Sequence, residues 1–278
     1  VLIGGVKRIA SVSQIIVPFM AVIYFVFAVI LICCNITKVP AAFATIVTAA
    51  FSPKAITGGA VGSMLIAMQK GVARGIFSNE AGLGSAPIAA AAAQTNSPVR
   101  QGLVSMTGTF IDTIIICTLT GLSIVLTGAW QVEGLEGVQV TTYAFQHGLP
   151  FPAQFSSFIL MLCLVFFAFT TILGWDYYSE RCLEYLSGGN MKHVKIFRWI
   201  YILAVFIGPY MTVSAVWTIA DIFNGLMAIP NMIALFALSG VIVKETRAFF
   251  QHAKEEALAE HRSFEEVCDC LLYTSDAA

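Results

Sequence analysis

Five long stretches of this 278-residue sequence contain no Asp, Glu, Lys or Arg. They cover residues 9 to 37, 113 to 132, 137 to 175, 199 to 220 and 222 to 243. A helix of roughly 20 apolar residues crosses the ~30 Å hydrocarbon core of a bilayer, and most of these stretches are that long. The sequence is 58% hydrophobic and 11% charged, against about 25% charged in soluble domains. We therefore predict an all-α integral membrane protein in a lipid bilayer.

Charge and composition exclude several function classes. The formal net charge is −1 and the basic residues stand singly at the ends of apolar stretches, so no nucleic-acid partner is expected. The seven cysteines lack metal-ligand spacing. The histidines fall in predicted loops and the tail, at His147, His193, His252 and His261. We expect no enzyme, no cofactor and no site for a metal held by Cys or His ligands.

The pattern predicts six membrane spans of alternating orientation. They are residues 11 to 34, 59 to 93, 102 to 126, 154 to 178, 196 to 213 and 217 to 243. Lys7 and Arg8 place the start of the first span in the cytoplasm by the positive-inside rule. Residues 36 to 58 suit an amphipathic segment at the outer surface. The last span is one helix or two; one crossing is preferred because it leaves Lys244 and Arg247 inside.

The ends of the sequence are treated separately. The chain opens on Val1 within a loop-and-helix-start pattern, which predicts a fragment. Residues 1 to 250 are predicted to form the transmembrane fragment and residues 251 to 278 a cytoplasmic tail. Within that tail, residues 263 to 278 are of doubtful relevance to the native protein.

The segment from Gly75 to Ser85 is unusual for an apolar span. Asn79 and Glu80 stand among glycines there, and Pro87 follows. Glycines alone serve close helix packing in bilayers, but a buried polar pair favours a functional role. An unwound stretch at mid-membrane frees backbone groups and helix ends that bind a zwitterion and a cation together. The segment therefore predicts a binding site for both.

The residues that carry this pattern resemble a known family. SNEAGLGSAPIA, with VPFMAVIY upstream, QG after SPVR, and FTTILGWDYYSERC downstream, closely resembles the alanine or glycine:cation symporter family, from Gly4 to about Arg247. That resemblance implies a leucine-transporter-like inverted-repeat fold of two five-helix repeats. The chain would then hold helices five to ten, possibly eleven, with the first four helices missing.

The resemblance also implies a substrate pocket at the break of the sixth helix. Phe77, Ser78 and Asn79 would line it with side chains and backbone. Gly82 and Gly84 would let the chain turn closely around the ligand.

The eighth helix of the fold would supply the facing residues. Thr171 and Trp175 lie one turn apart on one face and would line the pocket, while Thr170 and Thr171 would complete a sodium site. Hydroxyl oxygens suit a hard cation. Thr can equally bond its own i−4 carbonyl, and Trp175 can equally be an interfacial residue.

Four charged residues are candidates for gating or coupling. Asp112 is a lone carboxylate in a span, which favours a role in transport. Alternatively, its side chain caps a helix or pairs on the side of Arg100. Glu80 or Asp112 would serve proton coupling if burial kept it protonated. By analogy with the fold, Arg74 and Asp221 would form an external gate.

The predicted function is sodium-coupled symport of a small neutral amino acid, alanine or glycine, across the cytoplasmic membrane by alternating access. The alternatives are a proton-coupled amino-acid carrier and, less favoured, a channel or a non-transporting membrane subunit. A channel would need a continuous polar line or repeated filter, and an intramembrane enzyme would need a catalytic cluster. Neither pattern is evident.

Overall fold

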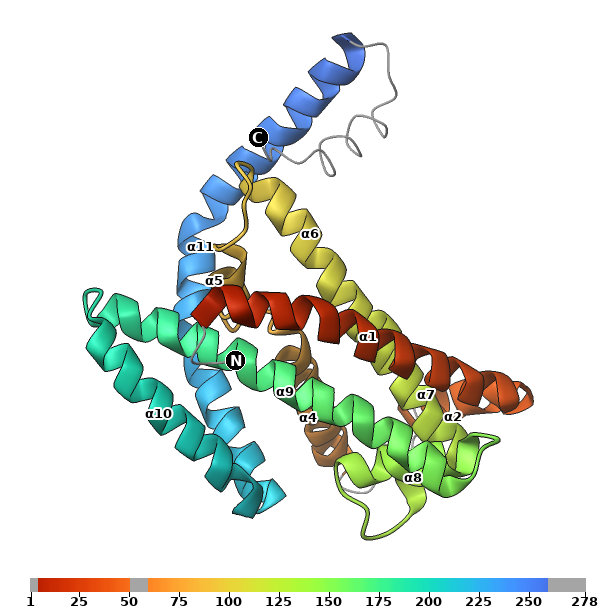
Figure 1. Cartoon of the computed structure of the whole chain (residues 1–278). Coiled ribbons are helices and arrows are strands. Elements are labelled where there is room, and N and C mark those ends of the chain that lie inside the picture. Colours follow the sequence, from red (N-terminus) through yellow and green to blue (C-terminus); the bar gives the residue numbers. More distant parts are fainter. Residues whose placement is uncertain (1–4, 51–59, 260–278) are drawn as a thin grey trace. The chain divides into compact units, whose positions relative to one another are not determined.

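The computed structural model describes residues 5 to 50 and 60 to 259. These residues form helices and connecting loops without a β-strand, so the all-α prediction is confirmed for the described part of the chain. The chain divides into two compact units. Of the described residues, unit 1 comprises 5 to 50, 60 to 72 and 114 to 211, and unit 2 comprises 73 to 113 and 212 to 259. Figure 1 labels the elements, and each unit is described by itself.

Unit 1 is built mainly from long helices. Its elements are α1 (Gly5–Cys34), η2 (Ile36–Lys38), α2 (Val39–Ala50), the part of α4 (Ala60–Asn79) up to Val72, the last residues of η3 (Ile111–Ile116), α7 (Cys117–Thr127), η4 (Ala129–Gln131), α8 (Val138–Gly148), α9 (Ala153–Leu186), α10 (Met191–Ile207) and η5 (Gly208–Tyr210). Two glycines with positive φ, Gly188 and Gly189, form the turn after α9. The chain reverses there, so that α9 and α10 form a hairpin (Figure 1).

The core of unit 1 lies where α1 packs against α7, α8 and α9. Tyr24 of α1 stacks on Phe145 of α8 with ring centroids 5.7 Å apart, and Leu31 and Leu160 are almost fully buried beside them. The Tyr24 hydroxyl also bonds to Thr120 of α7. Aromatic stacking adds to the burial of apolar area, and the paired hydroxyls satisfy each other within the helix interface.

Unit 2 takes the end of one helix, two short helices and the longest helix of the chain. Its elements are the end of α4 (Ala60–Asn79), α5 (Ala86–Ala90), α6 (Pro98–Phe110), the first residues of the π-helix η3 (Ile111–Ile116) and α11 (Val213–Ala259). Ser97 caps α6 by accepting a hydrogen bond from the backbone N–H of Arg100, as N-cap residues do.

Four helical stretches among the described residues are long and apolar enough to cross a membrane: Ser11–Cys34, Pro98–Thr127, Ala153–Leu186 and Val213–Glu256. They coincide with four of the six predicted spans. The other two predictions correspond to α4, whose 20 residues include Lys70 and Arg74, and to α10, which has 17 residues.

Some predicted boundaries differ from the structure. The sequence pattern extends the fifth span to residue 213, but α10 ends at Ile207, just before Pro209, which cannot continue a helix without losing a backbone hydrogen bond. The prediction of one final helix rather than two is confirmed, since α11 runs through Pro230 without interruption and on to Ala259.

Two other predictions fall partly on undescribed residues. Of the segment from residue 36 to 58, η2 and α2 are helical, and residues 51 to 59 lie outside the described part. Residues 251 to 259 of the predicted tail continue α11, and residues 260 to 278 lie outside the described part.

Candidate functional site

The candidate site of unit 2 begins where α4 stops. The helix passes through Gly75 and ends at Asn79, and the chain resumes as α5 at Ala86. The Asn79 side chain stabilises the first residues of the break by accepting a hydrogen bond from the Ala81 N–H at 2.9 Å. Such Asx turns offer the backbone an alternative to the helix. The predicted interruption is thus confirmed, and it covers Glu80 to Ser85.

The backbone of this break has a strained conformation at Glu80 and packs closely against a neighbouring helix at Gly84. Glu80 has φ of 57°, a left-handed value that a non-glycine residue adopts at a cost. Ser85, which is 1% exposed, donates a 2.7 Å hydrogen bond to the Glu80 carboxylate. Gly84 has φ of 83°, and a Cβ there would lie 3.1 Å from Oδ1 of Asn231 on α11. The break therefore requires glycine at Gly84 for both conformation and space.

Two side-chain hydrogen bonds join the end of α4 to the π-helix η3. Ser78 donates to Oδ2 of Asp112 at 2.7 Å, and Asn79 donates through Nδ2 to Oγ1 of Thr113 at 3.1 Å. A π-helical turn inside an α-helix is rare and occurs frequently at functional sites. The broken helix and the π-helical turn are thus joined by hydrogen bonds between their polar side chains.

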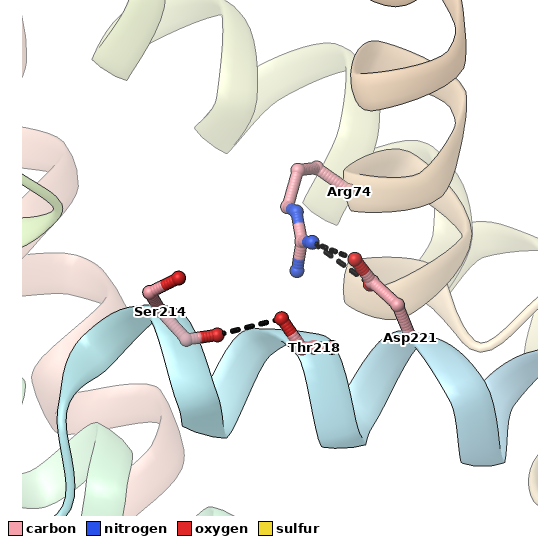
Figure 2. A network of polar contacts seen from close by, with 4 residues as sticks. All are labelled: Arg74, Ser214, Thr218 and Asp221. Atoms are coloured by element: carbon pink, nitrogen blue, oxygen red, sulfur yellow. Dashed lines mark hydrogen bonds and ion pairs between the residues drawn. The ribbon is translucent and has the colours of Figure 1, made fainter.

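An ion pair links α4 to α11 on the N-terminal side of the break. Nη2 of Arg74 lies 2.8 and 2.7 Å from the two carboxylate oxygens of Asp221 (Figure 2). The Arg74 guanidinium also stacks 3.8 Å from the ring centroid of Trp217, and Phe77 meets the same ring edge-on at 5.2 Å. Both side chains of the ion pair are 33% exposed. The predicted pairing of Arg74 with Asp221 is therefore present, reinforced by a cation–π contact.

Figure 2 also shows how α11 presents its polar residues beside this pair. The Thr218 hydroxyl donates to the carbonyl of Ser214 at 2.9 Å, within its own helix. The Thr218 hydroxyl is thus hydrogen-bonded within its own helix, as threonine hydroxyls in membrane helices often are. Asp221 is the residue of this stretch that reaches across to α4.

The predicted sodium and pocket residues of the eighth-helix segment belong to unit 1, on α9. The Thr170 hydroxyl donates to the carbonyls of Phe166 and Phe167 at 3.0 and 3.1 Å. This is the local bond anticipated as the alternative for Thr170, and it leaves the hydroxyl lone pairs able to meet a cation. Thr171 is exposed, and Trp175 is half-buried with an edge-on contact to Tyr178.

A buried charged cluster on α9 and α10 was not predicted. Asp176 and Glu180, one turn apart on α9, are 0% and 3% exposed. Arg198 of α10 binds both carboxylate oxygens of Glu180, through Nε and, at 2.8 Å, through Nη2. The fork geometry of an Arg–carboxylate pair makes this a strong contact.

Some of these contacts could have been predicted from the sequence, and others could not. Trp217 stands one turn before Asp221, an i,i+4 spacing that would have placed both on one face of α11. By contrast, nothing in the local pattern indicates that Asn231 covers Gly84, or that Arg198 returns to Glu180 from the next helix.

The long apolar helices and their interrupted neighbour define a multi-pass membrane protein. The chain belongs to the sodium:alanine symporter family, whose family model matches residues 1 to 263. This confirms the resemblance drawn from the sequence motifs.

Individual relatives agree with this membership. The chain is 56% identical over 255 residues to an uncharacterized transporter of Haemophilus influenzae, an alignment that covers 91% of this chain and 55% of the relative. It is 47% identical over 260 residues to the sodium/alanine symporter AgcS of Methanococcus maripaludis, covering 92% and 55%. It is 36% identical over 255 residues to the amino-acid carrier protein AlsT of Bacillus subtilis, covering 92% and 53%. The chain spans about half the length of these curated relatives.

Proposed function

We propose that the protein containing this chain is a carrier, not an enzyme, that couples Na⁺ entry to the uptake of a small neutral amino acid, alanine or glycine. The observation that carries the proposal is the break from Glu80 to Ser85 within a chain of the sodium:alanine symporter family. A broken membrane helix offers carbonyls and N–H groups that a continuous helix keeps bonded. Two relatives are named as a sodium/alanine symporter and an amino-acid carrier.

In this proposal the substrate lies against the break. Phe77, Ser78 and Asn79 line the pocket, and the backbone at Gly82 and Gly84 approaches the ligand without side chains between them. The polar ends of Ser78 and Asn79 are already oriented by Asp112 and Thr113. Such pre-orientation lowers the entropy cost of binding a small zwitterion.

The proposal also includes the residues of α9 that the family resemblance implies: Thr171 and Trp175 as substrate-binding residues, and Thr170 with Thr171 as oxygen ligands to Na⁺. A hard cation prefers oxygen ligands of this kind. The fold is proposed to be the leucine-transporter type, with this chain as helices five to ten. Residues 1 to 250 would form its membrane part and residues 251 to 278 its cytoplasmic tail.

The gate in this proposal is the contact between Arg74 and Asp221. Its groups are partly exposed, and an exposed ion pair contributes only about 0 to 1 kcal/mol. A contact of that strength can open and close repeatedly during alternating access, while the ring of Trp217 keeps the guanidinium in place. The carboxylates of Glu80 and Asp112 would tune coupling close to the break.

The test is uptake of radiolabelled alanine into proteoliposomes that contain the full-length protein, with and without an inward Na⁺ gradient. Gradient-driven accumulation that excess glycine inhibits is expected. Asn79→Ala should abolish accumulation, and Thr107→Ala, which removes a hydroxyl bonded within its own helix, should not. Uptake that is indifferent to Na⁺ would remove the coupling from the proposal.

A further inference from the structure

Among the described residues, one buried acidic side chain has neither a role in the proposed function nor a hydrogen-bond partner. Asp176 on α9 is 0% exposed, and neither Oδ1 nor Oδ2 has a hydrogen-bond partner in the described part of the chain. Buried polar groups in folded proteins are almost always paired. A carboxyl group with two unpaired oxygens out of contact with solvent therefore needs an explanation.

The charges around Asp176 do not neutralise it. On its own helix the next carboxylate is Glu180, and the guanidinium of Arg198 on α10 is already bound to Glu180 through two nitrogens. From α10, Tyr201 directs its hydroxyl to the backbone carbonyl of Ile172 at 2.9 Å. The cluster of Asp176, Glu180 and Arg198 thus holds two carboxylates and one cation.

The other helices packed against α9 add no described partner. On α1 the charged side chain among the described ones is Arg8, which is exposed at the start of the helix. Helix α8 meets the first turns of α9, where Gln146 donates to Ser157, about five turns from Asp176. Farther along α9, Arg181 is paired with Glu184 at 2.6 Å.

An ionised Asp176 would be costly in this setting. Removing a carboxylate from water without compensating bonds costs at least several kcal/mol, and a like charge one turn away adds to the cost. A sodium ion would need several oxygen ligands, whereas both Glu180 oxygens are engaged by Arg198. A proton removes the charge with one O–H bond and no further ligand.

We propose that Asp176 is a proton-binding site. Its carboxyl takes one proton from water as it becomes buried between α9 and α10, keeps that proton while it is buried, and releases it to water when the contact opens. The proton-binding claim stands on the geometry of unit 1 alone. The consequence that transport becomes sensitive to pH rests on the proposed function.

Infrared difference spectroscopy on the full-length protein in lipid tests the site directly, because a protonated carboxyl has a carbonyl stretch that a carboxylate lacks. We expect this signal to grow as the pH is lowered from neutral, to be shifted by ¹³C labelling of aspartate and to be lost in Asp176→Asn. The matched control is Glu184→Gln, a carboxyl on the same helix that is 31% exposed and paired, which should leave the signal unchanged.

Two further arms make the result decisive. Asp176→Glu keeps a carboxyl group, so the infrared signal should then respond to ¹³C labelling of glutamate instead of aspartate. This variant tests the site even if Asp176→Asn fails to fold. Absence of any protonated aspartate signal in the unsubstituted protein, or its survival in Asp176→Asn, would overturn the proposal. Loss of the signal on adding Na⁺ at fixed pH would also overturn it and assign the site to sodium.

Uptake measurements separate this inference from the proposed function. In proteoliposomes, Asp176→Asn should lose the pH dependence of alanine uptake that the unsubstituted protein and Glu184→Gln both show. If no protein in the series transports alanine, the proposed function fails while the infrared result still decides the proton site. If transport is present and its pH dependence is the same in Asp176→Asn, the link between this proton and transport is wrong.

Discussion

The hydroxyl of Ser78 donates a 2.7 Å hydrogen bond to Oδ2 of Asp112, and this bond joins the last turn of α4 to the π-helical turn η3. The bond connects a neutral donor to a carboxylate, a class of contact worth about 1.5 to 3 kcal/mol. It places a charge directly beside the broken segment. Substitution at either end therefore tests whether the pair acts as one unit.

Asp112→Asn and Ser78→Ala should each reduce alanine uptake, by about tenfold or more if the full value of the charged hydrogen bond is lost. The double variant should be little worse than the worse of the two single variants, because Ser78→Ala removes this hydrogen bond and Asp112→Asn removes the charge that strengthens it, so both changes act on the same contact. Initial rates in proteoliposomes measure this. Thr107→Ala is the control, and fully additive losses would show that the two residues act independently.

Breaking the ion pair of unit 2 should impair transport in a way that charge alone does not restore. Arg74→Lys keeps the positive charge but loses the planar guanidinium that stacks on Trp217 and meets both Asp221 oxygens. We expect Asp221→Asn and Arg74→Lys to lower the uptake rate, and Thr218→Ala beside them to leave it near normal. An Arg74→Asp, Asp221→Arg double variant that recovers no uptake would argue against a gate formed by these charges.

Gly84→Ala should destabilise unit 2 by about 1 to 3 kcal/mol, because the left-handed φ is strained for alanine and the new Cβ would press on Asn231. Thermal unfolding in detergent measures the effect. Gly240→Ala on α11 is the matched control, since a Cβ added there would meet no neighbouring side chain within 4 Å, and alanine is the better helix former. Equal melting temperatures for both variants would contradict the strain argument.

Arg198→Met should be among the most destabilising substitutions in unit 1. It leaves Glu180 buried without its partner, a change that typically costs about 3 to 5 kcal/mol. Adding Glu180→Gln should recover much of that loss. Thermal unfolding of the single and double variants measures both effects. Arg181→Gln is the comparison, because the pair it breaks is partly exposed and an i,i+3 contact is worth about 0.2 to 0.5 kcal/mol.

Thr171→Val should raise the Na⁺ concentration needed for half-maximal uptake, about tenfold if one oxygen ligand worth ~1.4 kcal/mol is lost. Thr170→Val should have the smaller effect, because its hydroxyl is already bonded to two carbonyls of α9. The measurement is uptake as a function of Na⁺ at constant ionic strength. An unchanged Na⁺ dependence in both variants would remove these threonines from the sodium site.

The sequence predicted the long elements well because their signal is local. Charge-free length alone located the helix over Ser11–Cys34, and the flaw at Pro230 is too weak to divide α11, as predicted. The break was also visible, although it begins later than the glycine cluster. Gly75 remains helical, since one glycine inside a helix costs only about 1 kcal/mol.

The contacts between helices were harder to predict. Asp176 and Glu180 follow a long apolar stretch, where carboxylates ordinarily mark the return to water, and their burial depends on α10 folding back. The π-helical turn at Asp112 was not predicted, since its sequence from Ile111 to Ile116 contains no glycine or proline that would mark an irregular helix. Side-chain pairs such as Asn79 with Thr113 depend on that same turn.

The helix α11 contacts the chain on both sides of the break, through Asp221 with Arg74 and through Asn231 beside Gly84. These two anchor points are ten residues apart on one uninterrupted helix, which fixes their axial separation at about 15 Å. The continuous helix α11 therefore holds the two sides of the unwound stretch at a constant separation. The stretch cannot straighten or rewind without breaking either the ion pair or the contact at Gly84. Both contacts therefore depend on the conformation of residues 80 to 85.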